Sequence, residues 1–404
     1  MATSPSALYQ EPVVGGFRAA GVHCGIKRRG RDLALIASDR PASVAGVFTR
    51  SSVVGAPVEW CRAQVRSGTG RGVVANSGIS NVAMGARGQR NAESMAALAA
   101  RELGCRQEEL FVASTGVIGV PLPMAKLRSG IPRVAKRLRP GGLREAAEAI
   151  RTTDTFAKCI GVEARVARRT VTVAGIAKGS GMIEPDLATM LGFLFTDAAV
   201  SPRFLRRILG RVADASFNRL TVDGETSTSD TVLLFANGAS GNPRLCGPSS
   251  PGAQAFESAV TRVAVSLARD LARDGEGATK LVTVRVTGAA TRAQAERAAR
   301  RIANSMLVKT AIFGRDPNWG RILQTVGAAR VAIRLDRAVV RLCGVPVFRA
   351  GASTGAAARR RAATRLAADE VEIEVSLAAG RAKARVWTCD LSYDYVRINA
   401  EYTT

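Results

Sequence analysis

Thr189 is the residue of this chain with the clearest potential for covalent chemistry. It follows a small residue, Ala188, in a stretch that reads KGSGMIEPDLATML from residue 178 to residue 191. A threonine hydroxyl is a weak nucleophile unless a base lies beside it, and the threonine's own α-amine can be that base. That amine becomes free only if the Ala188–Thr189 bond is cut. If it is cut, the protein is an enzyme built from two halves of its own chain.

The scarcity of histidine narrows the choice of catalytic base. His23 is the one histidine among the 404 residues. A serine–histidine–aspartate or cysteine–histidine site would have to be built on it, and a metal site that needs two imidazoles is excluded. We interpret His23, which lies in a glycine-rich segment, as a hydrogen-bonded structural residue, and we expect no metal.

Three glycine-containing segments carry side chains that suit acyl transfer. A hydroxyl and an amide from Thr115 and Gly116 can together stabilise an oxyanion. The same sequence could also be a plain turn that ends a strand. Lys178, before Gly-Ser-Gly, can bind a carboxylate or stand in a surface turn. Glu276 can meet an ammonium group, while the glycine before it, Gly275, suits the end of a helix.

Helical and strand patterns alternate along the chain and must position these segments. Helices are expected at about 91–103, 143–151, from 202, 256–271 and 291–306. Strands are expected at 33–36, 44–48, 72–75, 111–119, 170–176 and 281–286, with a Gly/Asn loop at 76–81. Two strand pairs are expected at 331–342 and 371–387, turning at 336–337 and 379–380, and an apolar strand at 396–404. The fold class is α/β (α+β), with helices packed on mixed sheets.

No proline- or serine-rich linker separates residue 188 from residue 189. A cut at this point would therefore leave two chains folded together, an α chain of residues 1–188 and a β chain of residues 189–404. We expect these halves to be intertwined within one folded body.

The composition indicates an ordinary globular protein, with 47% hydrophobic and 23% charged residues. Residues 1–15 show no secretory signal and no apolar run reaches the length of a membrane span, so a cytoplasmic location is expected. The seven cysteines are scattered, which fits a reducing compartment. The net charge of +25 would suit nucleic acid, but the basic residues are dispersed and no nucleic-acid-binding motif accompanies them.

The chain resembles the ornithine acetyltransferase family, also called bifunctional glutamate N-acetyltransferase/ornithine acetyltransferase, over essentially its whole length. Many ordered motifs carry the resemblance, and together they are far more specific than any one of them. They lie at 21–27 (GVHCGIK), 32–36 (DLALI), 45–49 (AGVFT), 112–119 (VASTGVIG), 152–155 (TTDT), 177–183 (AKGSGMI), 188–191 (ATML), 274–280 (DGEGATK), 316–321 (DPNWGR) and 398–404 (INAEYTT).

The resemblance implies an acetyltransferase of arginine biosynthesis that cuts itself between Ala188 and Thr189. It further implies that the two chains assemble as an α2β2 heterotetramer. Thr189 would take acetyl from N-acetylornithine, release ornithine and pass the acetyl group to glutamate in a ping-pong reaction. No cofactor is expected to stay bound. Acetyl-CoA stays open as a co-substrate, because a monofunctional member only recycles acetyl groups whereas a bifunctional one also loads them from acetyl-CoA.

Position by position, the resemblance gives roles to individual residues. The oxyanion hole is matched by Thr115 and Gly116. The substrate-binding set is matched by Thr155, Lys178, Thr189, Glu276, Asn399 and Thr404.

The sequence departs from the family pattern in three places. The loop at 76–85 reads NSGISNVAMG in place of NSGNANACTG, and residues 223–230 read DGETSTSD in place of DGDTSTND. The segment at 355–365 is rich in alanine and arginine where relatives are often acidic. The alternatives are a paralogue acting on another acylated amino acid, an amidohydrolase that passes the acyl group from Thr189 to water, and a basic binding protein without catalysis.

Overall fold

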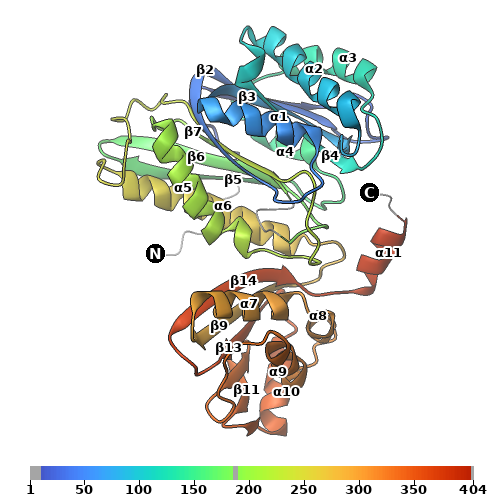
Figure 1. Cartoon of the computed structure of the whole chain (residues 1–404), viewed down its shortest axis with the longest axis vertical. Helices are drawn as coiled ribbons and strands as arrows, with labels where there is room; N and C mark the ends of the chain where they lie inside the picture. The colour runs from blue at the N-terminus through green and yellow to red at the C-terminus, as the bar shows by residue number, and fades with distance from the viewer. Residues whose placement is uncertain (1–10, 185–189, 402–404) are drawn as a thin grey trace.

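The computed structural model describes residues 11–184 and 190–401, which form a larger and a smaller α/β body stacked along the long axis (Figure 1). Ala188, Thr189 and Thr404 lie outside the described residues. In the part of the chain that is described, no helix has the length and apolar character needed to cross a membrane.

The larger body is built on a sheet with the strand order β4-β3-β2-β8-β7-β6-β5, and β1 adds to β2. The β3–β4 and β7–β8 pairs are parallel and the other neighbours are antiparallel, so the sheet is mixed. The strands are β1 (Phe17–Val22), β2 (Leu33–Phe48), β3 (Thr69–Ile79), β4 (Leu110–Val117), β5 (Lys158–Val166), β6 (Arg169–Lys178), β7 (Leu191–Thr196) and β8 (Thr231–Ala236).

The long strand β2 lets this sheet fold over on itself. Residues 33–37 of β2 pair with β1 and β3, its register shifts between Ala37 and Ala42, and residues 43–48 pair with β8. The two halves of the sheet then face each other across an aromatic core, in which the Phe111 ring of β4 meets the Phe235 ring of β8 edge-on at 5.5 Å. Burial of such rings is a major favourable term in folding.

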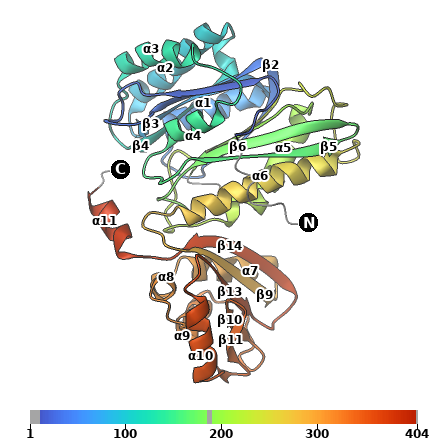
Figure 2. The ribbon, with the colours of Figure 1, turned by 180° about the vertical axis from the view of Figure 1, so that it is seen from behind.

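Helices cover both outer faces of the folded sheet (Figures 1 and 2). α5 and α6 pack on β5–β8, α2 and α3 pack on β1–β4, and α4 enters the core between the two halves. Apolar residues at helical spacing, such as Phe204, Ile208 and Val212, are all buried in α5. The helices are α1 (Ala56–Gln64), α2 (Gly85–Leu103), α3 (Met124–Ala135), α4 (Leu143–Ile150), α5 (Pro202–Ala215) and α6 (Ala253–Arg273), with 3-10 turns at Val65–Ser67, Gln107–Glu109 and Phe217–Arg219.

The smaller body has the strand order β12-β11-β10-β13-β9-β14 and its own apolar core. Its strands are β9 (Leu281–Ala289), β10 (Val339–Leu342), β11 (Val345–Arg349), β12 (Ala352–Ser353), β13 (Glu370–Ser376) and β14 (Ala382–Cys389). Its helices are α7 (Arg292–Ala303), α8 (Met306–Phe313), α9 (Trp319–Ala328) and α10 (Ala356–Arg365). The last helix, α11 (Tyr393–Glu401), stands beside both bodies, as Figure 2 shows from behind.

The expected fold class, α/β with helices on mixed sheets, is confirmed. Four local predictions are wrong. β13 and β14 do not pair with each other, because β9 lies between them. The hairpin predicted at 336–337 instead joins β10 and β11 at 343–344, and the predicted loop at 76–81 begins within β3. The carboxyl-terminal segment predicted as a strand is the helix α11 up to Glu401.

Candidate active site

A cavity of about 380 Å³ lies where the end of β4, the end of β6, the loop before β8, the loop after α6 and α11 meet. It contains five of the predicted site residues, Thr115, Gly116, Lys178, Glu276 and Asn399. The other residues that line it are Ser80, Ile118, Thr152, Thr153, Gly181, Met182, Asp223, Glu225, Thr226, Ser227, Thr228, Ser229 and Tyr395.

The predicted oxyanion pair stands at the end of β4. Gly116 has φ of +126°, and a Cβ placed on it would lie 2.3 Å from the carbonyl carbon of Gly78 on the parallel strand β3. Only glycine fits this backbone position, because a larger residue would both clash and adopt a conformation that L side chains disfavour. Its neighbour Thr115 directs its hydroxyl oxygen to within 3.4 Å of the Lys178 Nζ atom.

Lys178 ends β6 and brings a positive charge to the same side of the cavity. Its ammonium group donates a 2.8 Å hydrogen bond to the Thr152 hydroxyl and lies 4.0 Å from a carboxylate oxygen of Asp154. Burial lowers the pKa of Lys178, and the charge of Asp154 opposes that shift. The cavity is therefore lined by the Lys178 ammonium group, whereas its nearby carboxylate, that of Asp154, does not line the cavity.

Asp154 connects several parts of this wall. Its carboxylate accepts hydrogen bonds from the Lys158 ammonium at 2.8 Å, the Gly179 amide at 2.7 Å and the Thr152 amide at 3.1 Å. Burial alone would raise the pKa of Asp154, but the charges of Lys158 and Lys178 and the Gly179 amide hold it well below its ordinary value. Sequence reasoning missed Asp154, although it lies inside the TTDT motif.

Thr155 is the predicted substrate-binding residue that the structure does not bring into this cavity. Its amide donates to both carboxylate oxygens of Asp274, at 3.2 and 3.1 Å, and its hydroxyl donates to the same group. Asp274 also lies 2.5 Å from the Lys158 ammonium, so Thr155 belongs to the buried ionic cluster and borders a different cavity. Thr152 and Thr153 of the same motif line the cavity instead.

Glu276 brings a negative charge into the cavity from the loop after α6. Its carboxylate accepts a hydrogen bond from the Thr153 hydroxyl at 2.7 Å and from the Asn399 side-chain amide at 2.8 Å. A Cβ on Gly181 would lie 2.4 Å from that carboxylate, so glycine there leaves room for it. Asn399 reaches Glu276 from α11, where its side chain also donates to the Tyr395 carbonyl one turn earlier.

Asp223 was not predicted, yet it holds the chain where it approaches the proposed cut. Its carboxylate accepts hydrogen bonds from the amides of Met182 at 2.6 Å and Ile183 at 2.8 Å. Glu184, the last residue described before the gap, donates its amide to the Glu225 carbonyl at 2.7 Å. On the other side of the gap, the Met190 carbonyl accepts from the Thr231 amide at 3.0 Å. The described residues that flank 185–189 are thus attached near the cavity.

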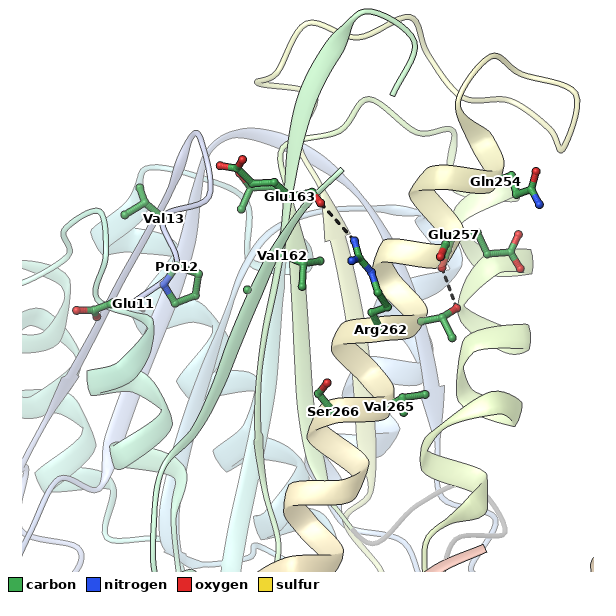
Figure 3. Close-up of a pocket in the computed structure, with 14 residues that line it drawn as sticks. Glu11, Pro12, Val13, Val162, Glu163, Gln254, Glu257, Arg262, Val265 and Ser266 are labelled. Atoms are coloured by element: carbon green, nitrogen blue, oxygen red, sulfur yellow. Dashed lines mark hydrogen bonds between the residues drawn. The ribbon is translucent and has the colours of Figure 1, made fainter. Parts of the chain in front are cut away.

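A larger cavity, about 1010 Å³, lies between residues 11–13, β5 and α6 (Figure 3), and none of the predicted site residues that the structure describes line it. Its wall carries Glu163 and Glu257, while Arg262 donates to the Glu163 carbonyl at 3.3 Å. His23 does not line the smaller cavity either; its Nδ1 atom lies 2.7 Å from the Gly30 carbonyl oxygen. Among residues 11–184 and 190–401, no cluster of His, Cys, Asp and Glu has metal-binding geometry.

The smaller cavity brings Lys178 and the Thr115–Gly116 turn together with the carboxylates of Asp223 and Glu276, so its wall carries both a positive charge and negative charges. Comparison with known proteins gives the family: the ArgJ family model matches residues 18–404, and the chain belongs to this family.

The chain is similar to two curated relatives, each called "Arginine biosynthesis bifunctional protein ArgJ". The one from Symbiobacterium thermophilum is 48% identical over 96% of this chain and 97% of its own. The one from Geobacter sulfurreducens is 48% identical over 97% of this chain and its full length. A crystal structure of the protein of that name from Bacillus halodurans is 40% identical, with a TM-score of 0.49 over 51% of this chain and 96% of its own. Membership of the family confirms the predicted class, an acetyltransferase of arginine biosynthesis.

Proposed function

We propose that this chain moves an acetyl group from N-acetylornithine to glutamate by way of an acetyl ester on Thr189. The observation that carries the proposal is the charge arrangement of the 380 Å³ cavity, with Lys178 beside Thr115 and Gly116, and with Glu276 and Asp223 also in its wall. An amino acid with an anionic α-carboxylate and a cationic side chain complements that arrangement.

In this proposal, Lys178 binds the α-carboxylate that both amino acids carry, together with the Thr152 hydroxyl to which it donates. Glu276, oriented by Asn399, meets the side-chain ammonium group of ornithine. We propose Thr152 in place of Thr155, because the Thr155 hydroxyl is bonded to Asp274 outside the cavity. Thr404 remains a proposed substrate-binding residue from the family resemblance alone.

The transfer then runs in two halves. The α-amine of Thr189 takes the proton of its own hydroxyl, and the Oγ atom attacks the acetyl carbonyl of N-acetylornithine. Thr115 and Gly116 stabilise the oxyanion, the nitrogen of ornithine leaves with the proton, and the acetyl ester stays on Thr189. The amine of glutamate attacks that ester and restores the free hydroxyl.

Self-cleavage between Ala188 and Thr189 prepares the nucleophile and gives chains 1–188 and 189–404. The interleaved strand order supports joint folding of the two chains: β2 and β6 come from residues before the cut, whereas β7 and β8, between them in the sheet, come from residues after it. From the family resemblance we further propose an α2β2 assembly in the cytoplasm. The word "bifunctional" in the names of the relatives supports acetyl-CoA as a second acetyl donor.

A comparison of the wild-type chain with Thr189→Ala tests this proposal. The wild type should give two fragments in denaturing mass spectrometry and transfer acetyl from N-acetylornithine to glutamate, whereas the variant should stay intact and inactive. A Thr189→Ala variant that still transfers acetyl would refute the assignment. Release of free acetate at the rate of ornithine formation, with no acetylglutamate, would favour the amidohydrolase alternative instead.

A further inference from the structure

Two basic segments that are far apart in the sequence meet at the surface of the larger body. The first, residues 23–31, joins β1 to β2, and the second, residues 124–137, forms α3 and the turn after it. Neither segment contains an aspartate or a glutamate. Their basic residues are Lys27, Arg28, Arg29 and Arg31 in the first segment and Lys126, Arg128, Arg133, Lys136 and Arg137 in the second. The reaction proposed above gives none of them a role.

A buried carboxylate fixes the backbone of residues 23–31. The side chain of Asp32 is fully buried, and it accepts hydrogen bonds from the amides of Cys24 at 2.6 Å, Gly25 at 3.1 Å and Lys27 at 2.9 Å. The negative charge of Asp32 is therefore directed at backbone amides and not at the guanidinium groups of the loop.

Helix α3 supports the same loop from the side. The Lys126 ammonium group donates to the Gly25 carbonyl, and the Arg133 guanidinium group donates to the His23 carbonyl. Both contacts bring further positive charge to the loop and add no negative charge. The two segments thus form one basic surface, although their residues are dispersed in the sequence.

Arg28 and Arg29 are the residues of this surface that are best placed to bind an anion. Both side chains are exposed, and neither guanidinium group forms an ion pair or a hydrogen bond with another described residue. The exposed Arg18, by contrast, pairs with Asp39 at 2.7 Å. A guanidinium group without a carboxylate partner can bind a phosphate group through two parallel hydrogen bonds.

The basic loop borders the candidate active site in two places. A Cβ on Gly78 would lie 3.1 Å from the Lys27 Cγ atom, and Gly78 pairs with Gly116 of the oxyanion turn. The Lys27 ammonium group also donates to the Arg151 carbonyl at 3.0 Å, directly before Thr152 in the cavity wall. Arg28 and Arg29 therefore follow a residue that packs against the edge of the site.

A short apolar strip connects the cavity with the basic surface. Residues 117–123 lead from the oxyanion turn to α3 and read VIGVPLP. Ile118 lines the cavity, and Val120 is 39% exposed. A ligand that suits this arrangement has a reactive acyl group at one end, a slender arm in the middle and phosphate groups at the other end.

We propose that residues 23–31 bind the phosphate groups of acetyl-CoA, with Arg28 and Arg29 as the phosphate ligands. The inference rests on the proposed use of acetyl-CoA as a second acetyl donor. Acetyl-CoA carries its thioester at one end of the pantetheine arm and a pyrophosphate and a 3′-phosphate at the other. With the phosphates at the two arginines, the arm passes over Ile118 and Val120 and the thioester enters the cavity. N-acetylornithine has no phosphate and does not need this surface.

The test measures the binding of CoA to the purified protein by isothermal titration calorimetry, which does not depend on turnover. Arg28→Gln combined with Arg29→Gln should raise the Kd for CoA roughly 10- to 150-fold, as expected from the loss of one charged hydrogen bond. KM for acetyl-CoA should rise by a similar factor, whereas KM for N-acetylornithine should not rise. An unchanged Kd in a protein that transfers acetyl from N-acetylornithine to glutamate would overturn this inference alone. A wild-type protein without that transfer would overturn the proposed function itself.

The matched control removes the same charge from the smaller body. Arg359 and Arg360 are exposed on α10, and Arg359→Gln combined with Arg360→Gln should leave the Kd for CoA unchanged. An equal rise of Kd in both double variants would mean that net charge alone attracts CoA, and it would overturn the assignment to the loop. Binding of a single-stranded RNA oligonucleotide without binding of CoA would assign the surface to nucleic acid and would also overturn it.

Discussion

Replacing Asp154 by asparagine removes one negative charge from beneath the cavity and leaves two buried lysines poorly compensated. Lys158 is fully buried and lies 2.8 Å from Asp154, and Lys178 lies 4.0 Å from it. Removing one partner of a buried ion pair destabilises proteins by about 3–5 kcal/mol. Lys158 keeps Asp274 at 2.5 Å, so we expect a loss near the lower limit, about 3 kcal/mol.

The assay is urea unfolding in a Thr189→Ala background, in which a single uncut chain unfolds. Asp39→Asn is the control, because it removes an exposed pair with Arg18 whose side chains are 42% and 45% exposed. Such a surface pair contributes less than about 1 kcal/mol. A loss below about 1 kcal/mol for Asp154→Asn would refute the reasoning, since it would mean that the buried cluster carries no net charge compensation.

The pH dependence of unfolding follows from the same group. The pKa of Asp154 is lower in the folded protein than its ordinary value, so its stabilisation is complete above the unfolded pKa of about 4 and is lost as the pH falls further. Asp154→Asn should therefore flatten the acid side of the stability curve. An unchanged acid limb in the variant would contradict the lowered pKa.

Three further predictions concern catalysis. In steady-state kinetics, Lys178→Met should raise KM for glutamate roughly 10- to 150-fold, as expected from the loss of one charged hydrogen bond. The control is Lys126→Met at an exposed lysine, which should leave KM for glutamate unaltered. Gly116→Ala should lower kcat by roughly 10²- to 10³-fold, because the added Cβ displaces the oxyanion turn, and an unchanged kcat would contradict that role. The activity should fall below about pH 8 as the Thr189 α-amine gains a proton, and a limb that persists after this amine is blocked would rule it out as the base.

Much of the candidate site could be predicted because its residues stand where strands and helices with a clear apolar pattern end. Gly116 and Lys178 stand at the ends of strands whose apolar pattern is readable, and Glu276 follows a long amphipathic helix. The same local reading fails where partners are distant in sequence. Nothing in the TTDT motif tells which threonine faces the cavity, because the pairing of Thr155 with Asp274 spans 119 residues.

Long-range pairing also explains the errors in the fold. The strand β9 enters between β13 and β14, which are adjacent in the chain, and no local pattern signals that insertion. In the carboxyl-terminal segment, the Asn399 side chain donates to the Tyr395 carbonyl four residues earlier, which is a helical spacing. No side chain of this helix is fully buried, so the segment has no apolar stripe that would have predicted a helix. An apolar alternation over so few residues cannot distinguish helix from strand.

The acetyl ester on Thr189 is the central claim, and trapping it is the most direct test. The processed protein would be mixed with N-acetylornithine in the absence of glutamate, quenched in acid, digested and sequenced by mass spectrometry. We expect one added acetyl group on a peptide that begins at Thr189, and its loss when glutamate is added before the quench. An acetyl group on another residue, or turnover with an unmodified Thr189 and no burst of ornithine, would contradict the account.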